Sequence, residues 1–267
     1  MKLALRVAYD GTAFYGFQRQ PDVRTVEGEL IRALKKLGVI GDPEKAEFKG
    51  ASRTDRSVSA LFNVVSFTPT RRPDLARPEV LNHHLSDVWV VGVAEVPEDF
   101  HPRFWAKSKT YRYYLVNEGF DVEAIKRCSR LFVGRHDFSA FSRLEPGRKP
   151  VRKLERVEVI LRQGYLVLEL EGKSFLWEMA RRIVNALRLC ALGLLGEDEI
   201  REMLKGTYAK KVPPAPAEGL VLWRIDYPGI QFRIDEKGLR KARRDIFERY
   251  SRALTRAALF GDALFEL

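Results

Sequence analysis

Residues 3–12 read LALRVAYDGT, a short, mostly apolar run that ends in a turn signal. This pattern predicts a β-strand followed by a tight turn. Thr25 then stands at the N-cap position of a predicted helix, whose apolar face repeats at helical spacing. Further strands or helices are predicted over residues 60–68, 78–85 and 88–96. The first hundred residues therefore alternate strands and helices.

The same alternation returns in the second hundred residues. Apolar patterns predict elements over residues 110–117, 122–132, 157–161, 165–170, 197–204 and 220–227. Ser174 is expected to cap a long helix, which carries Arg181, Asn185 and Arg188 on its polar side. Two halves that each mix strands and helices predict an α+β fold with approximate internal duplication. We expect an N-terminal half at residues 1–104, a C-terminal half at 105–228 and a basic helical extension at 229–267.

Length and composition exclude several classes of protein. The chain has 267 residues, of which 45% are hydrophobic and 31% charged, so it is expected to be globular rather than disordered. Its two cysteines, Cys128 and Cys190, are too few for a disulfide framework and lack zinc-ligand spacing. Neither a signal peptide nor an apolar run of about 20 residues, the length of a membrane span, is present. We therefore expect a cytoplasmic protein with no membrane association.

Net charge is the first indication of a partner. The chain carries 47 Lys and Arg against 36 Asp and Glu, a formal charge of +11. The excess is +7 over residues 105–228, against +1 for residues 1–104 and +3 for residues 229–267. A basic excess favours a polyanion, because phosphate contacts release counterions. A solvated basic surface without a specific partner remains the alternative.

The most unusual stretch is residues 50–60, GASRTDRSVSA, in which one carboxylate lies between two arginines. Small residues allow a substrate to approach the backbone closely, and Arg53 or Arg56 could keep Asp55 ionised. An ionised aspartate in such a loop could act as a nucleophile or a base. From these residues alone, a turn in which Asp55 only caps backbone amides is the favoured interpretation.

A set of motifs in a fixed order changes this balance. They are Tyr9–Gln20 (YDGTAFYGFQRQ), Ser52–Asp55 (SRTD), Phe100–Phe104 (FHPRF) with Thr110–Tyr113 (TYRY), Gly134–Phe138 (GRHDF) with Phe141, Phe175–Arg181 (FLWEMAR) and Ala215–Leu220 (APAEGL). Together these blocks resemble the TruA-type tRNA pseudouridine synthases, and they cover about residues 3–227. Each block alone is weak, whereas the ordered set is specific. Val58-Ser59-Ala60 is similar to the archaeal and eukaryotic members.

The resemblance implies a function and a fold. It implies isomerisation of uridine to pseudouridine at positions 38, 39 and 40 in the anticodon stem-loop of tRNA, by a homodimer that needs no cofactor or metal. Asp55 would be the catalytic carboxylate and Arg181 its ionic partner, while Tyr111 would stack on the target uracil. Arg53 would help to displace the base. The implied fold is two ferredoxin-like halves that form one continuous, mostly antiparallel sheet flanked by helices, with a central cleft.

Other basic residues would bind RNA through its phosphates. Besides Arg53, we expect Arg56, Arg143, Arg148 and Lys149 to contribute, the last three from the run that continues through Arg152 and Lys153. The family's usual small pair after the aspartate is replaced by Arg56-Ser57. Ser57 is therefore expected to avoid a positive φ that glycine would tolerate.

Two other functions stay open at this point. A non-catalytic tRNA-binding protein on the same scaffold would retain the basic surface but lack turnover. A metal-dependent nuclease normally needs several carboxylates around Mg²⁺, and this loop offers only Asp55. For residues 235–265, an RNA-contacting arm and a packing helix with a solvated face are both compatible with the sequence.

Overall fold

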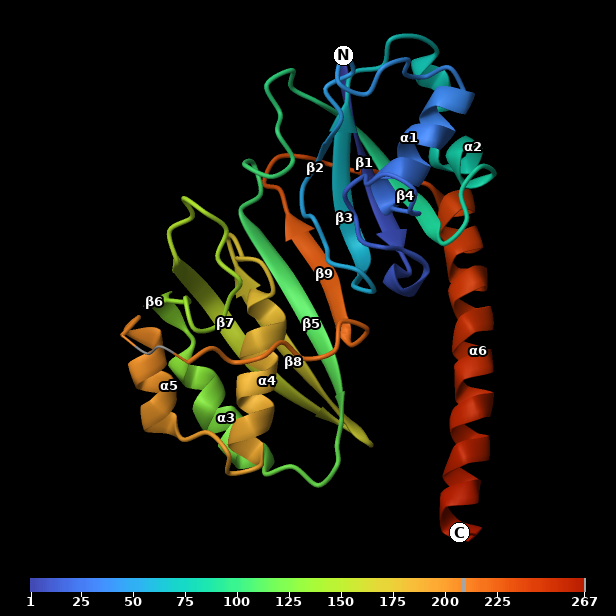
Figure 1. Ribbon diagram of the computed structural model, residues 1–267. Coiled ribbons are helices and arrows are strands. Elements are labelled where there is room, and N and C mark those ends of the chain that lie inside the picture. The colour runs from blue at the N-terminus through green and yellow to red at the C-terminus, as the bar shows by residue number, and fades with distance from the viewer. Residues whose placement is uncertain (208–209, 267) are drawn as a thin grey trace.

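One large β-sheet runs through the protein (Figure 1). The computed structural model describes residues 1–207 and 210–266, and in this part of the chain the sheet has ten strands. The path is β10-β4-β1-β3-β9-β5-β8-β7-β6, and β2 pairs separately with β3. Its strands are β1 (Lys2–Tyr9), β2 (Lys49–Gly50), β3 (Ser59–Phe67), β4 (Val88–Val96), β5 (Ser108–Val116), β6 (Gly134–Asp137), β7 (Val151–Arg162), β8 (Tyr165–Gly172), β9 (Leu220–Asp226) and β10 (Arg233–Ile234).

Two sets of strands meet where β3 lies beside β9. This pairing is parallel, with Ser59 opposite Val221 and Ala60 opposite Leu222. The other pairings of the sheet described here are antiparallel. The sheet is therefore continuous, which confirms the expected α+β class with a mostly antiparallel sheet. Because β3 begins directly after the 50–58 segment, this segment lies at the junction of the two sets.

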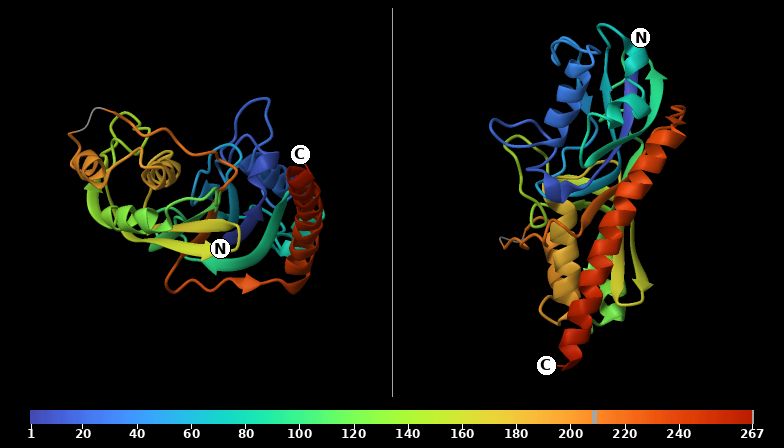
Figure 2. Two further views of the ribbon diagram at one scale, coloured as in Figure 1. Left: turned by 90° about the horizontal axis from the view of Figure 1, so that it is seen from below. Right: turned by 90° about the vertical axis from the view of Figure 1, so that its right-hand side faces the viewer.

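Helices pack against both parts of the sheet (Figures 1 and 2). They are α1 (Val26–Lys36), α2 (Pro78–Asn82), α3 (Val122–Leu131), α4 (Met179–Ala191), α5 (Glu197–Leu204) and α6 (Glu236–Glu266), with 3-10 turns η1 (Gly11–Ala13) and η2 (Pro73–Leu75). The predicted cap of α1 is confirmed, because the Thr25 side chain accepts a hydrogen bond from Gly28 N. Leu30 and Leu34 of α1 and Ile183 and Leu187 of α4 are fully buried in the main core.

The start of α4 differs from the sequence prediction. The helix begins at Met179, and Ser174 is not its cap. The N-cap position is held by Glu178 in the left-handed conformation, with φ of 60°, so the chain turns sharply just before the helix. Residue type alone favoured Ser174 as a cap, whereas the chain before α4 is held by a distant segment, since Arg143 N donates to the Trp177 carbonyl at 2.9 Å. Arg181 and Asn185 nevertheless lie on α4 as expected.

The C-terminal segment forms one helix of 31 residues, α6, rather than two. Its first part lies against β4 and α2, and its second part extends beyond the strands (Figures 1 and 2). Among the described residues, none of the helices is both long and apolar enough for a membrane span.

Candidate active site

Residues 51–58 connect β2 to β3 and are called here the aspartate loop. Buried polar side chains of β3 and β5 hydrogen-bond to the start of this loop. Ser52 Oγ and the Tyr111 hydroxyl share a hydrogen bond of 2.8 Å. Asn63 on β3 donates to the Ser52 carbonyl at 2.9 Å, and Lys109 Nζ donates to the Ala51 carbonyl at 2.6 Å. These side chains are buried, so their hydrogen bonds are protected from competing water. The start of the loop is therefore firmly anchored to β3 and β5.

The N-terminal motif packs against the other side of the aspartate loop. Phe17 N donates to the Thr54 carbonyl at 3.0 Å. Gly16 has a φ of +111°, and a Cβ there would lie 3.2 Å from the Thr54 carbonyl oxygen. A Cβ on Gly11 would lie 2.2 Å from the Val58 carbonyl, which leaves no room for any side chain. The glycines of this motif are thus required by the close approach of two backbone segments.

Asp55 and Arg181 form an ion pair across the junction of the two halves of the sheet. Arg181 Nη1 donates to Asp55 Oδ2 at 3.4 Å, and 28% of the Asp55 side chain is exposed. Burial raises the pKa of Asp55, and the negative charge of Glu178 adds to this rise. The positive charge of Arg181 and hydrogen bonds from Arg181 and Trp177 oppose the rise without cancelling it. The carboxylate is therefore partly desolvated and still open to a ligand.

Arg181 is fixed by the loop that precedes β9. Its Nε donates to the Ala215 carbonyl at 2.7 Å, and Ala215 N donates to the Arg181 carbonyl at 3.1 Å. One residue is thus held through its side chain and its backbone. A guanidinium clamped in this way leaves one edge directed at Asp55. The Ala215–Leu220 motif therefore has a structural role, because its first residue orients Arg181, the ionic partner of Asp55.

Tyr111 lies beneath the aspartate loop on β5, next to a register shift between Thr110 and Tyr111. Only 8% of the residue is exposed, and its ring packs edge-on against Phe175 with centroids 4.8 Å apart. Burial raises the pKa of Tyr111 to about 12, although the hydrogen bond with Ser52 opposes the rise. Its hydroxyl therefore stays protonated at neutral pH. The structure thus brings together the three residues that we expected to be catalytic: Asp55, Tyr111 and Arg181.

The expectation for Ser57 is wrong. Ser57 adopts a φ of +66°, the left-handed region that glycine occupies more easily. Val58 N donates to the Asp55 carbonyl at 3.2 Å, which closes a tight turn around Arg56 and Ser57. Gly11 packs closely against the backbone of Val58, and Gly16 against that of Thr54 and Arg56, so the chain is confined at this turn. Glu178, whose charge acts on Asp55, also has a positive φ, and such backbone strain is common near functional sites.

A cluster of arginines lies beside the site. Burial together with the charges of Arg148 and Arg53 lowers the pKa of Arg103, and burial together with Arg148 and Arg103 lowers that of Arg152. We call these four residues the arginine cluster. Glu145 lies 3.5 Å from Arg148 and offsets part of the charge. Like charges repel one another, so their proximity is typical of an anion-binding surface.

Arg103 and Trp177 are the site residues that the sequence reasoning did not single out. Arg103 lies within the FHPRF motif, which was the available signal for it. Trp177 is 42% exposed, and its hydrogen bond to Asp55 lowers the pKa of that carboxyl. The Arg143 guanidinium lies over the Trp177 ring, 4.2 Å from its centroid. Trp177 therefore connects the aspartate with a surface arginine.

The other predicted RNA-binding residues are spread around this centre. Arg56 is exposed and stacks on Tyr15, with 4.3 Å between the guanidinium carbon and the ring centroid. Lys149 is exposed next to Arg148, before β7. Arg53 lies in the aspartate loop, Arg148 belongs to the arginine cluster and Arg143 lies over the Trp177 ring. Across residues 1–207 and 210–266, groups of three or more His, Cys, Asp or Glu side chains suited to a metal ion are absent.

Comparison with known proteins indicates the family of this chain. Residues 128–228 match the family model described as tRNA pseudouridine synthase. The chain is 77% identical over 266 residues to tRNA pseudouridine synthase A of Thermococcus kodakarensis, covering 100% of both chains. It is 53% identical to the protein of that name from Pyrococcus furiosus, covering 99% of this chain and 98% of the relative. The chain belongs to the tRNA pseudouridine synthase family.

The chain is also similar to a less identical relative and, weakly, to solved structures. The tRNA pseudouridine synthase A of Methanocella arvoryzae is 42% identical over 243 residues, covering 91% of this chain and 90% of the relative. A crystal structure of the archaeal box H/ACA sRNP Nop10–Cbf5 complex matches with a TM-score of 0.37 and 10% identity, over 70% of this chain and 42% of that chain. A score this low establishes no shared fold. Membership in the pseudouridine synthase family confirms the expectation of an isomerase.

Five of the six motif blocks that resemble the family meet around Asp55, whereas GRHDF lies on β6 at the edge of the sheet. The YDGT motif lies on one side of the aspartate loop and TYRY lies beneath it. FLWEMAR supplies Trp177 and Arg181, and APAEGL holds Arg181 in place. FHPRF contributes Arg103 to the arginine cluster. In this member of the pseudouridine synthase family, segments far apart in the chain thus build one site.

Proposed function

We propose that this protein converts uridine to pseudouridine at positions 38, 39 and 40 of the anticodon stem-loop of tRNA, with Asp55 as the catalytic carboxylate. The observation that carries the proposal is the partly buried ion pair between Asp55 and Arg181. The reaction breaks the N1–C1′ bond of uridine and joins C5 to C1′. The C5 proton leaves to solvent and N1 takes up a proton, so the product is an isomer of the substrate. Loss of the C5 proton gives the reaction a simple assay.

Positive charge develops at C1′ as the glycosidic bond breaks, and a carboxylate can stabilise or trap it. Asp55 serves this purpose in its ionised form. Arg181 favours the ionised form, orients the carboxylate and holds it against repulsion by Glu178. The carboxylate is poorly solvated by water, which strengthens its interaction with a developing cation. An ionised Asp55 paired with Arg181 could either attack C1′ or remove a proton from the ribose, and both roles need the same arrangement.

Access to C1′ requires that the uridine leave the base stack. We assign Arg53 to the gap left by the base, and Tyr111 to a stacking contact with the uracil, worth about 1–3 kcal/mol. Phosphates would be bound by Arg56, Arg143, Arg148 and Lys149, together with Arg103 and Arg152 of the arginine cluster. The proximity of like charges in this cluster supports the assignment, because a bound polyanion relieves their repulsion.

The remaining assignments follow the same resemblance. Residues 1–104 and 105–228 would form two halves with the RNA in a central cleft between them, and the active form would be a homodimer. A cytoplasmic location is supported by the two cysteines, Cys128 and Cys190, which are both buried as free thiols. No cofactor is assigned, since the reaction as written needs none.

The assay uses unmodified tRNA transcripts with tritium at C5 of uridine, without any cofactor. Wild-type protein is expected to release tritium from transcripts that carry uridine at position 38, 39 or 40. Transcripts with cytidine at all three positions are the matched control and should release none. Tight, salt-sensitive binding without tritium release would instead identify a non-catalytic tRNA-binding protein. Cleavage of the RNA that depends on Mg²⁺ would indicate a nuclease.

A further inference from the structure

The extension after β9 is docked on the sheet by its own contacts. Val88 and Val90 of β4 point into the main core, so the alternating residues Trp89 and Val91 point to the opposite face. There they form a small cluster with Ala8 and with Ala242 of α6. The indole of Trp89 donates to Asp245 at 2.9 Å, and Lys237 pairs with Glu79 at 2.7 Å. The first part of α6 therefore needs no further anchor.

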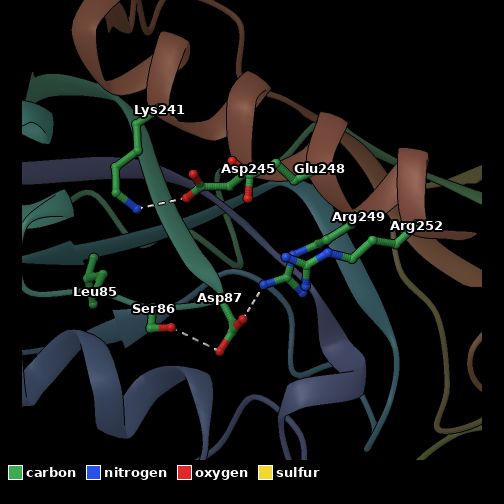
Figure 3. Close-up of a pocket in the computed structure, with 8 residues that line it drawn as sticks. All are labelled: Leu85, Ser86, Asp87, Lys241, Asp245, Glu248, Arg249 and Arg252. Atoms are coloured by element: carbon green, nitrogen blue, oxygen red, sulfur yellow. Dashed lines mark hydrogen bonds and ion pairs between the residues drawn. The ribbon is translucent and has the colours of Figure 1, made fainter.

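Arg249 lies one turn beyond Asp245 and reaches to the ends of two neighbouring strands. Its guanidinium forms an ion pair with Asp10, directly after β1. It forms a second with Asp87, directly before β4, and Figure 3 shows this one. The two carboxylate residues are also connected to each other, since Asp10 N donates to the Asp87 carbonyl at 3.1 Å. Burial opposes ionisation of Asp87, but hydrogen bonds from Arg24 and Arg249 outweigh it and lower its pKa.

Asp10 is also the first residue of the segment that supports the aspartate loop. Its Oδ1 accepts hydrogen bonds from Thr12 N at 3.0 Å and Thr12 Oγ1 at 2.6 Å, which caps the turn η1. Gly11 N donates to Ser59 Oγ at 3.0 Å, and Gly11 lies directly against the Val58 carbonyl. The position of Asp10 thus sets the position of the segment that follows it.

This support continues along the loop on both sides of Asp55. Ser57 N lies 3.5 Å from the Phe14 carbonyl, and Phe17 N donates to Thr54 at 3.0 Å. Asp55 lies between Thr54 and Ser57 in the chain. A displacement of the segment at Asp10 would therefore be passed to the backbone that carries the carboxylate. Positioning errors of about 1 Å can lower an enzymatic rate by about a hundredfold.

We propose that Arg249 is a positioning residue for catalysis, which connects helix α6 through Asp10 to the aspartate loop. It does not touch the substrate. Its effect is to hold Asp10 and Asp87 together, so that residues 11–17 keep the loop in the conformation in which Asp55 faces Arg181. The C-terminal extension would thus contribute to the active site from the far side of the sheet. The kinetic part of this inference rests on the proposed function, whereas the structural part does not.

A double-mutant cycle tests the connection. Arg249→Ala is expected to lower the single-turnover rate of tritium release about tenfold and to leave the Kd for tRNA unchanged. In the Asp10→Asn background, which keeps an oxygen for Thr12, the same change should have little further effect. Arg249→Lys should recover part of the rate. Arg256→Ala, which removes the same charge about two turns further along α6, is the matched control and should behave as wild type.

Hydrogen exchange provides a readout that does not require activity. Peptides that cover residues 10–17 and 51–58 should exchange about tenfold faster in Arg249→Ala, while those from β7 and β8 should not change. Unchanged exchange and rate in Arg249→Ala would overturn the proposal, and so would additive losses in the cycle. Weaker tRNA binding with a normal saturating rate would also overturn it, in favour of an RNA contact. If wild type releases no tritium, the proposed function fails, and the exchange data still decide the connection.

Discussion

Arg181 on α4 and Asp55 in the aspartate loop, 126 residues apart in the chain, form an ion pair of 3.4 Å whose arginine is clamped by Ala215. The clamp fixes the direction of the guanidinium. A positive charge at this position without that orientation is therefore not sufficient to pair with Asp55 in the same geometry. We expect Arg181→Lys to lower the single-turnover rate by about 10²-fold, because lysine cannot bond Ala215 and Asp55 with the same planar group. Arg188→Lys, on the same polar side of α4, should have little effect. Equal rates for both variants would contradict the assigned role.

The pKa of Asp55 is raised, mainly by burial, and this predicts the direction of a stability change. A carboxyl with a raised pKa in the folded protein is destabilising when ionised, and protonation at low pH relieves this effect. Asp55→Asn should therefore raise Tm at neutral pH by a few degrees while abolishing turnover. Calorimetry at pH 7 and at pH 4 provides the measurement. The gain should shrink at the lower pH; a lower Tm for the variant at pH 7 would contradict the prediction.

The same shift predicts the pH dependence of the reaction. Asp55 must lose its proton to act, so the rate should rise with pH through its raised pKa and then level off. The midpoint is expected above the ordinary aspartate value of 3.8. Single-turnover rates at saturating tRNA separate this step from binding. In Trp177→Phe the hydrogen bond to Asp55 is lost, so the midpoint should move further upward. A midpoint at or below 3.8 in wild type would argue against a desolvated carboxylate.

The hydroxyl of Tyr111 is expected to matter less than its ring. Tyr111→Phe removes the bond to Ser52 and should cost about 1 kcal/mol of stability, with a modest loss of rate. Tyr111→Ala removes the stacking surface as well and should lower the rate much further. Ser52→Ala removes the same hydrogen bond and keeps the ring, so it should resemble Tyr111→Phe. A Tyr111→Phe variant that binds tRNA normally and does not turn over would assign a direct role to the hydroxyl.

Ser57 offers a test of backbone strain next to the catalytic residue. Because its φ is +66°, Ser57→Gly should stabilise the protein by roughly 0.5–1 kcal/mol and leave the rate unchanged. Ser59→Gly is an instructive contrast, since Ser59 Oγ accepts a hydrogen bond from Gly11 N and its loss should be destabilising. Denaturant unfolding of both variants measures the change in the free energy of unfolding, which should be positive for Ser57→Gly and negative for Ser59→Gly. Destabilisation by Ser57→Gly would show that the strain is compensated by its side chain.

The sequence predicted the elements whose apolar pattern is strong. The range of β4 agrees with the prediction, and α1 and α5 begin where it placed them. Short strands were missed: β2, β6 and β10 are two to four residues long. The element predicted over residues 157–161 lies within β7, but β7 begins earlier, in the basic run that includes Arg152. Such strands form because a neighbouring strand is available, which local pattern does not report.

For the site, the sequence supplied residue types and the resemblance supplied their roles. No spacing rule connects Asp55 with Arg181 or Tyr111, since they come together only where the aspartate loop meets β5 and α4. Arg103 is recognised as a site residue only because it lies near Arg148 in the fold. Trp177 is recognised only because it donates a hydrogen bond to Asp55. The positive φ of Ser57 was missed because residue preference was weighed without the close packing of Gly11 and Gly16.

The central claim is that the carboxylate of Asp55 carries the chemistry. The most direct measurement is single-turnover tritium release by Asp55→Asn on a tRNA transcript, with the Kd measured on the same preparation. We predict that the rate falls by at least about 10³-fold while the Kd stays within about threefold of wild type. A residual rate within tenfold of wild type, with intact tRNA binding, would contradict the claim.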